Sequence, residues 1–71
     1  MELKPGDKVN YCPEHYRADG RFENGIVKSV HPTKTAVFVV YNCAGNWENY
    51  QDYTAACTML EDLMPGWRLN G

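Results

Sequence analysis

The sequence predicts a mainly β fold in which about five short strands curl into a small barrel. Short runs of β-branched and aromatic residues alternate with turns rich in Pro and Gly. The sequence contains no heptads, repeats or sustained helical periodicity. Its 71 residues allow one domain, residues 1–71, with a small core. A small sheet avoids exposed edges by curling on itself, which favours the barrel.

The first strand is predicted at residues 8–12, where Val9 and Tyr11 share one face. It follows a Pro-Gly-Asp turn that opens the ordered core, which we expect to span about residues 3–67. The polar segment PEHYRADGRFENG, residues 13–25, is interrupted by Pro and Gly. Such a composition predicts a long loop.

The second strand is predicted at residues 25–31, where the alternation is broken. Ile26 and Val30 share one face of this strand, whereas Val27 lies on the other face. A bulge or a strong twist near Gly25 would resolve this conflict.

The clearest predicted strand is AVFVVY, residues 36–41, which is β-branched and apolar on both faces. A barrel has one interior, so the outer face of this strand needs a cover. That cover is either the aromatic run that follows or a second copy of the chain. We therefore expect a monomer or a homodimer.

The C-terminal part of the chain predicts a further strand at residues 54–60, followed by the sequence LEDL, which fits a single helical turn. Trp67 follows a Pro-Gly pair, and we expect its large side chain to pack back on the barrel. Residues 68–71 are expected to fray.

The motifs KPGDKV, GIVKSV, AVFVVY and LEDLMPGW occur in the strand order of Tudor and KOW-type modules. Over residues 3–67 the chain therefore resembles these SH3-like small barrels. The resemblance implies a binding module rather than an enzyme. Tudor-like barrels often hold ligands in an aromatic cage or groove near the barrel mouth, and KOW-type modules bind RNA or ribosomal and transcription partners. The sequence also resembles small bacterial and phage-encoded proteins, which implies no particular activity.

The charge and cysteine content narrow the classes of partner. The formal net charge is -2, with 7 Lys plus Arg scattered among 9 Asp plus Glu. Nucleic-acid binders usually carry a basic patch and KOW-type modules are typically basic, so the charge disfavours nucleic acid. The longest apolar run is too short to span a membrane, and the N-terminal sequence lacks the apolar segment of a signal peptide. The cysteines are odd in number, so we expect a cytoplasmic protein with reduced thiols.

The stretch NWENYQDY is the first candidate site, because it sets the rings of Trp47, Tyr50 and Tyr53 beside the acids Glu48 and Asp52. Trp and Tyr are frequent binding hot spots, and rings beside carboxylates suit a cationic Arg, Lys or methylated Lys. An extended chain would place Trp47 and Tyr53 on one face, whereas a helical turn would pair Tyr50 with Tyr53. The stretch predicts a surface that binds a protein or peptide. The alternative is that the rings cap the small core.

The predicted loop supplies a second set of candidate residues: Tyr16, Arg17, Arg21 and Phe22. Long polar loops on rigid scaffolds often carry function. Two arginines beside two rings would suit phosphates and stacked bases. A nucleic-acid-binding module of the KOW type is therefore the alternative function.

The cysteines and histidines raise the question of a metal site. Cys12 and His15 have a C-x-x-H spacing, and Cys43 and Cys57 would complete four zinc ligands. A small zinc-stabilised domain is therefore a further alternative, but the wide separation of the cysteines does not match a zinc motif. Catalytic signatures are missing as well. We predict a non-enzymatic interaction module without catalytic residues, metal or cofactor.

Overall fold

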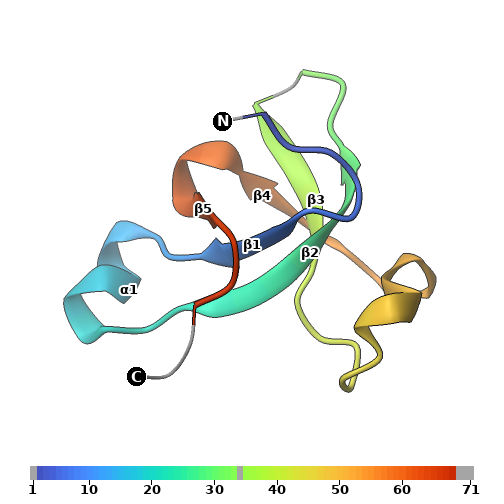
Figure 1. Cartoon of the computed structure of the whole chain (residues 1–71). Coiled ribbons are helices and arrows are strands. Elements are labelled where there is room, and N and C mark those ends of the chain that lie inside the picture. The colour runs from blue at the N-terminus through green and yellow to red at the C-terminus, as the bar shows by residue number, and fades with distance from the viewer. Residues whose placement is uncertain (1, 34, 69–71) are drawn as a thin grey trace.

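The computed structural model describes residues 2–33 and 35–68. They form a five-stranded antiparallel sheet in the order β4-β3-β2-β1-β5 (Figure 1). The strands are β1 (Lys8–Tyr11), β2 (Glu23–Val30), β3 (Ala36–Val40), β4 (Ala56–Met59) and β5 (Leu63–Pro65). The helical elements are α1 (Glu14–Asp19) and the 3-10 turns η1 (Trp47–Asp52) and η2 (Leu60–Asp62). The prediction of a mainly β domain with five short strands is confirmed.

The sheet is open rather than closed into a hydrogen-bonded barrel. β4 and β5 form its two edges, and no strand pairing joins them in the described part of the chain. Five strands are therefore present, as predicted, but the closed barrel predicted from the sequence is not confirmed. The predicted helical turn at LEDL is confirmed, because η2 lies between β4 and β5.

The main hydrophobic core lies on one face of the sheet, which we call the inner face. Residues directly opposite each other on antiparallel strands project to the same face. Val27 lies opposite Val39 in this way. The buried members of this core are Val9, Val27, Val37, Val39 and Leu63. β-branched side chains dominate because they pack well on a pleated surface.

The other face, which we call the outer face, is covered within a single chain. Lys8, Ile26 and Val40 lie opposite one another on this face, and Ile26 and Val40 are only 5% and 0% exposed. Trp67 crosses it after β5, where its indole Nε1–H donates to the Gly25 carbonyl at 2.8 Å. The Lys8 ammonium lies 4.6 Å from the Trp67 ring centroid. Trp67 thus packs back on the sheet as predicted. Among the described residues, the part of this face around Ile26 and Val40 is therefore not bare, and a homodimer stays a prediction.

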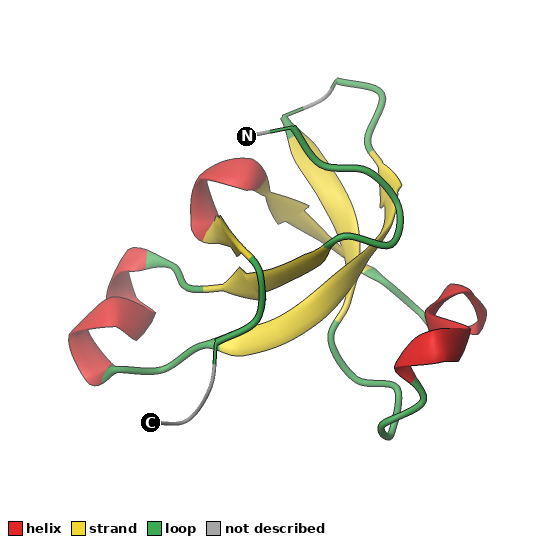
Figure 2. Cartoon of the chain, viewed as in Figure 1, coloured by secondary structure: helices red, strands yellow, loops and turns green. Residues whose placement is uncertain are grey.

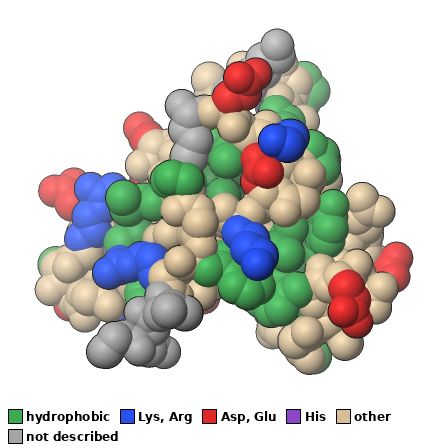
Figure 3. Space-filling view, in the orientation of Figure 1, with side chains coloured by type: hydrophobic (Ala, Val, Ile, Leu, Met, Phe, Trp, Pro, Cys, Tyr) green, Lys and Arg blue, Asp and Glu red, His purple; other side chains and the backbone are tan. Residues whose placement is uncertain are grey.

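The first half of the predicted loop instead forms the helix α1. Its boundaries agree with two local signals, because Pro13 precedes it and Gly20 follows it in the left-handed conformation, with φ 68°. The Gly20 N–H donates to the Arg17 carbonyl at 3.2 Å. The helix has six residues and buries none of them, so it lacks the apolar periodicity by which helices are predicted. Figure 3 shows basic side chains gathered at the end of the molecule that carries α1.

The second strand contains the predicted bulge, but at a different position. The register with β3 shifts between Val27 and Ser29 rather than at Gly25. Gly25 serves close packing instead, because a Cβ there would lie 2.5 Å from Cγ1 of Val39. The second strand also begins earlier than predicted, at Glu23.

The chain end shows one further difference from prediction. Arg68 is not frayed, because its N–H donates to Asn24 Oδ1 at 2.9 Å and its carbonyl accepts a hydrogen bond from Asn24 Nδ2 at 2.8 Å. The rest of the predicted frayed segment, residues 69–71, lies outside the described residues. Across the described residues, none of the helices is long and apolar enough to cross a membrane.

Candidate functional site

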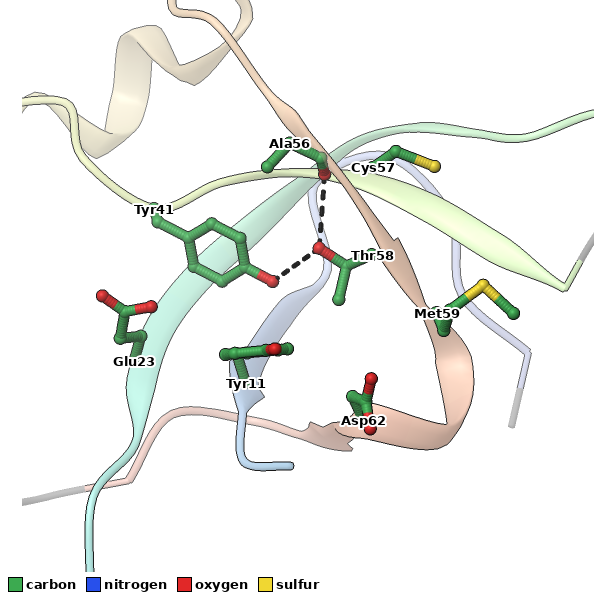
Figure 4. A pocket seen from close by; sticks show the side chains of 8 residues that line it. All are labelled: Tyr11, Glu23, Tyr41, Ala56, Cys57, Thr58, Met59 and Asp62. Carbon is green, nitrogen blue, oxygen red and sulfur yellow. Dashed lines mark hydrogen bonds between the residues drawn. The ribbon is translucent and has the colours of Figure 1, made fainter. Parts of the chain in front are cut away.

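A cavity of about 350 Å³ opens beside the inner face of the sheet (Figure 4). We call it the tyrosine pocket. It is lined by Tyr11, Glu23, Tyr41, Ala56, Cys57, Thr58, Met59 and Asp62. These residues come from distant parts of the chain, and the sheet order brings them together. Its lining includes two carboxylates but no Lys, Arg or His.

Strand alternation places the two tyrosines on the same face as the core. Tyr11 lies two residues after Val9, and Tyr41 lies two residues after Val39, so each ring projects from the inner side of its strand. Their ring centroids lie 5.9 Å apart at an interplanar angle of 66°. This edge-to-face arrangement makes two walls that meet at a steep angle.

Hydrogen bonds fix the tilt of the Tyr41 ring. The Tyr41 hydroxyl lies 2.8 Å from Thr58 Oγ1, and Thr58 donates to the Ala56 carbonyl at 3.3 Å. Because the Thr58 proton is used by Ala56, Tyr41 acts as the donor to Thr58. Thr58 is only 6% exposed, so this chain of hydrogen bonds forms a rigid, satisfied wall of the pocket.

Both tyrosines remain neutral at ordinary pH. Burial raises the pKa of Tyr41 to about 12. Burial also raises the pKa of Tyr11, with further contributions from the negative charges of Asp62 and Glu23. The pocket therefore combines neutral aromatic walls with a negative field from two carboxylates, which favours a positively charged group.

The aromatic run forms η1 at the other end of the sheet from α1 (Figure 2). Trp47, Tyr50 and Tyr53 are half-buried, whereas Glu48 and Asp52 are exposed. The segment is not one regular helix, because Asn49 inside it has the non-helical angles φ -107° and ψ 27°. Tyr53 follows η1 in an extended conformation, with φ -108° and ψ 155°. The structure therefore matches neither the extended chain nor the single helical turn considered from the sequence.

The aromatic run contacts the outer side of the sheet at both of its ends. The Trp47 ring centroid lies 5.0 Å from that of Trp67. The Lys28 ammonium, from β2, donates to the Tyr53 carbonyl at 2.8 Å. These contacts agree with the alternative in which the rings cap the core. A role for Trp47, Tyr50, Tyr53, Glu48 and Asp52 in binding stays a prediction.

The candidate residues around α1 line two neighbouring cavities, which share Gly20. Arg21 stacks on the Tyr16 ring at 4.3 Å and pairs with Asp19 at 3.2 Å. Arg17 is held elsewhere, because its Nε–H donates to the Cys12 carbonyl at 3.1 Å. The two arginines that suggested a nucleic-acid surface therefore line different cavities.

Phe22 makes a cation–π contact with Arg68, near the C-terminal end of the described residues. The Arg68 guanidinium lies 4.8 Å from the Phe22 ring centroid. Phe22 also shares a shallow surface pocket with Tyr16 and Arg21. Of the second candidate set, the structure thus brings Tyr16, Arg21 and Phe22 together in one pocket and places Arg17 in a neighbouring cavity.

The four possible zinc ligands are not assembled. Cys12 and Cys43 are buried and Cys57 is exposed, and all are free thiols. Within the described residues, no group of three or more His, Cys, Asp or Glu side chains is placed to hold a metal. The set of Cys12, His15, Cys43 and Cys57 on which the zinc-stabilised alternative depends is therefore not gathered among the described residues.

The pocket residues were missed because their signal is weak in the sequence. Each tyrosine extends an apolar i, i+2 pattern by one step, as in Val9 to Tyr11 and Val39 to Tyr41. This pattern could have marked the last inward position of each strand. Nothing local indicated that Glu23 and Asp62 would join them, because their approach depends on strand order.

Comparison with protein-family models, curated proteins and solved structures found no match for this chain. The resemblance to Tudor and KOW-type modules therefore rests on the sequence motifs alone. The geometry and charge of the tyrosine pocket are therefore the remaining indication of function.

Proposed function

We propose that this chain is a non-enzymatic interaction module that holds a cationic side chain of a protein or peptide in the tyrosine pocket. The observation that carries the proposal is the corner formed by Tyr11 and Tyr41 beside the carboxylates of Glu23 and Asp62. A cation within about 6 Å of an aromatic ring centroid is stabilised by about 0.5–2 kcal/mol. The carboxylates add charge attraction, and basic lining residues that would repel the ligand are absent from the pocket.

The shape of the site suits a single slender side chain. The cavity of about 350 Å³ is at the small end of the range for ligand sites. Arg, Lys and methylated Lys combine a positive head with an apolar stem that can lie along the rings. The sequence predicted the same cationic ligands for the aromatic run, whereas this proposal places them against Tyr11 and Tyr41.

We also propose that the fold belongs to the SH3-like small-barrel class. β4 and β5 are the opposite edges of the sheet, yet only the three residues of η2 connect them. The edges of a flat five-stranded sheet would lie about 19 Å apart at the usual strand spacing. A 3-10 turn rises only about 2 Å per residue, so this connection requires a strongly curled sheet. Such curling supports a small barrel, with the tyrosine pocket at its open seam.

The proposal is tested by calorimetric titration with a matched peptide set. Each peptide carries one central Arg, Lys, trimethyl-Lys or Gln in an otherwise neutral sequence. We expect saturable binding of the cationic peptides and none of the Gln peptide. Tyr11→Leu and Tyr41→Leu should each weaken binding by about 3- to 30-fold, since they remove a cation–π partner. Glu23→Gln and Asp62→Asn should each weaken it by about 2- to 5-fold.

Matched variants on η1 distinguish this site from the aromatic run. Glu48→Gln and Asp52→Asn remove the same charges at exposed positions outside the tyrosine pocket, and binding should be unchanged. The proposal fails if the Gln peptide binds as tightly as the cationic ones. It also fails if the η1 variants weaken binding while the folded pocket variants do not, which would place recognition on the aromatic run.

A further inference from the structure

A second cavity has the opposite charge to the tyrosine pocket. It has a volume of about 670 Å³ and lies between α1, β1 and the segment that follows β5. Its lining residues are Asn10, Cys12, Arg17, Gly20, Met64, Pro65 and Arg68. The charged groups in this lining are two guanidiniums, without a carboxylate. We call it the arginine cavity.

Both guanidiniums are anchored on a single residue. The Arg17 Nε–H donates to the Cys12 carbonyl at 3.1 Å, and Arg68 Nη1 lies 3.6 Å from Cys12 Sγ. Cys12 is itself only 1% exposed, so this anchor belongs to the rigid part of the fold. Two residues that are distant in the sequence are thus held with their positive charges near each other.

The positive charges of the cavity are not neutralised by the ion pairs of the described residues. Those ion pairs join Lys4 to Asp7 and Arg21 to Asp19, so they involve neither arginine of the cavity. Like charges held close together raise the local positive potential, and an anion between them would lower it. Guanidinium groups present several N–H donors in a planar fork that matches the oxygens of a phosphate.

The cavity also contains a buried acceptor without a partner. Asn10 is 2% exposed, and its Oδ1 accepts no hydrogen bond from the described residues. Its amide cannot simply be flipped, because Nδ2 donates to the Gly66 carbonyl at 2.9 Å. A buried acceptor is expected to find a donor, from a ligand or from a water that the ligand orders. Singly protonated inorganic phosphate supplies such a donor itself, whereas the dianion of a monoester has no proton to donate and supplies it through a water that it orders.

We propose that the arginine cavity binds a phosphate group with a free end, either inorganic phosphate or the phosphate monoester of a small molecule. Two guanidiniums match the charge of such a group, which is about -1.5 to -2 at neutral pH. A phosphodiester carries only one charge and satisfies the pair less well. This site is separate from the tyrosine pocket, so it does not depend on the cationic ligand proposed there.

The test is an NMR titration of the isotope-labelled protein at constant ionic strength. The probes are sodium phosphate, phenyl phosphate, dimethyl phosphate and sodium acetate. We expect saturable shifts of the Cys12 and Gly20 amides and of the Asn10 side-chain amide with the first two probes. Dimethyl phosphate and acetate should bind about tenfold more weakly or not at all, because each carries a single charge. Binding should weaken below the second pKa of phosphate, about 6, where the dianion is lost.

Three arginine variants make the result specific. Arg17→Gln and Arg68→Gln should each lower phosphate affinity about tenfold or more, since each removes charge-assisted hydrogen bonds. Arg68→Gln keeps the backbone hydrogen bonds with Asn24. It therefore tests the role of the guanidiniums in phosphate binding even if Arg17→Gln fails to fold. Arg21→Gln is the matched control at the same end of the molecule, and it should bind as the parent does.

Three outcomes would overturn the proposal. Equal chemical shift changes with acetate and with phosphate would reveal a general salt effect. Equal losses in Arg21→Gln and Arg68→Gln would show only a diffuse positive surface. Tighter binding of an oligonucleotide without terminal phosphates than of phenyl phosphate would identify a nucleic-acid surface instead. Tighter binding of sodium phosphate than of phenyl phosphate would identify a site for inorganic phosphate. The reverse order would identify a site for a phosphate monoester.

Discussion

The indole rings of Trp47 and Trp67 lie 5.0 Å apart, centroid to centroid, at an interplanar angle of 59°. Trp47 begins η1, and Trp67 follows β5, so the contact joins two segments that are not neighbours in the chain. Trp67 is itself tied to β2 by its hydrogen bond to the Gly25 carbonyl. The pair therefore helps to hold η1 against the outer side of the sheet.

A double-mutant cycle measures this contact. Trp47→Ala and Trp67→Ala should each destabilise the fold, and together they should show a coupling of about 0.5–1.5 kcal/mol, the range for aromatic pairs. Urea unfolding of the parent and the three variants gives the coupling. Trp47→Ala combined with Phe22→Ala is the control, and these changes should add within about 0.5 kcal/mol. Additive losses for the tryptophan pair would contradict the supporting role of Trp67.

Gly25 is predicted to be intolerant of a side chain. An alanine Cβ would meet Val39 Cγ1 at 2.5 Å and the Val40 carbonyl at 2.9 Å. We expect Gly25→Ala to lower the free energy of unfolding by about 1–3 kcal/mol, as overpacking does. The same change in a Val39→Ala background should be less destabilising, because the closest atom is gone. Equal losses in the two backgrounds, measured by urea unfolding, would show that Val39 is not the obstacle.

The tyrosine pocket should make stability depend on alkaline pH. The pKa of Tyr41 is raised to about 12 in the folded protein, above the value of 10.0 for a free phenol. The unfolded chain therefore loses this proton first, and stability falls as the pH rises from about 10 to about 12. Tyr41→Phe should reduce this fall while costing about 1 kcal/mol at neutral pH through the lost bond to Thr58. Urea unfolding across this pH range, with Tyr53→Phe as control, makes the comparison. If the free energy of unfolding of Tyr41→Phe falls with pH as steeply as that of the parent, Tyr41 is not the group responsible.

The three thiols should react at very different rates. Cys57 is exposed, whereas Cys12 and Cys43 are each only 1% exposed. We expect a small thiol reagent to modify Cys57 rapidly in the folded protein and the other two only after opening of the structure. Mass spectrometry of the peptides over time identifies each site, and labelling in urea provides the control. Rapid labelling of Cys12 in the native state would show that the anchor of the arginine cavity is not rigid.

Local patterns predicted β1 to β4 because each of these strands carries its own signal, whereas the three residues of β5 were not identified as a strand. AVFVVY predicted β3 through its β-branched residues, and the LEDL sequence predicted the turn η2. The helix α1 was missed because six exposed residues between Pro13 and Gly20 give no apolar periodicity. The bulge was expected from the conflict between Ile26 and Val27, but sequence alone did not place it correctly.

The candidate sites were harder to predict than the strands. NWENYQDY was a candidate because its rings are close together in sequence, yet all three rings are half-buried and Trp47 packs against Trp67. The contact of Tyr11 with Tyr41, and the approach of both Arg17 and Arg68 to Cys12, have no signal in the local sequence. Each depends on which strands become neighbours and where the chain returns after β5.

The sequence by itself determined the β class and the approximate positions of β1 to β4, because side-chain alternation and turn chemistry act over a few residues. Only the tertiary structure decided which charges meet. Strand order placed Glu23 and Asp62 beside the two tyrosines, and the path of the chain after β5 brought Arg68 to Cys12. Those contacts follow from the packing of the whole sheet, in which residues far apart in sequence become neighbours.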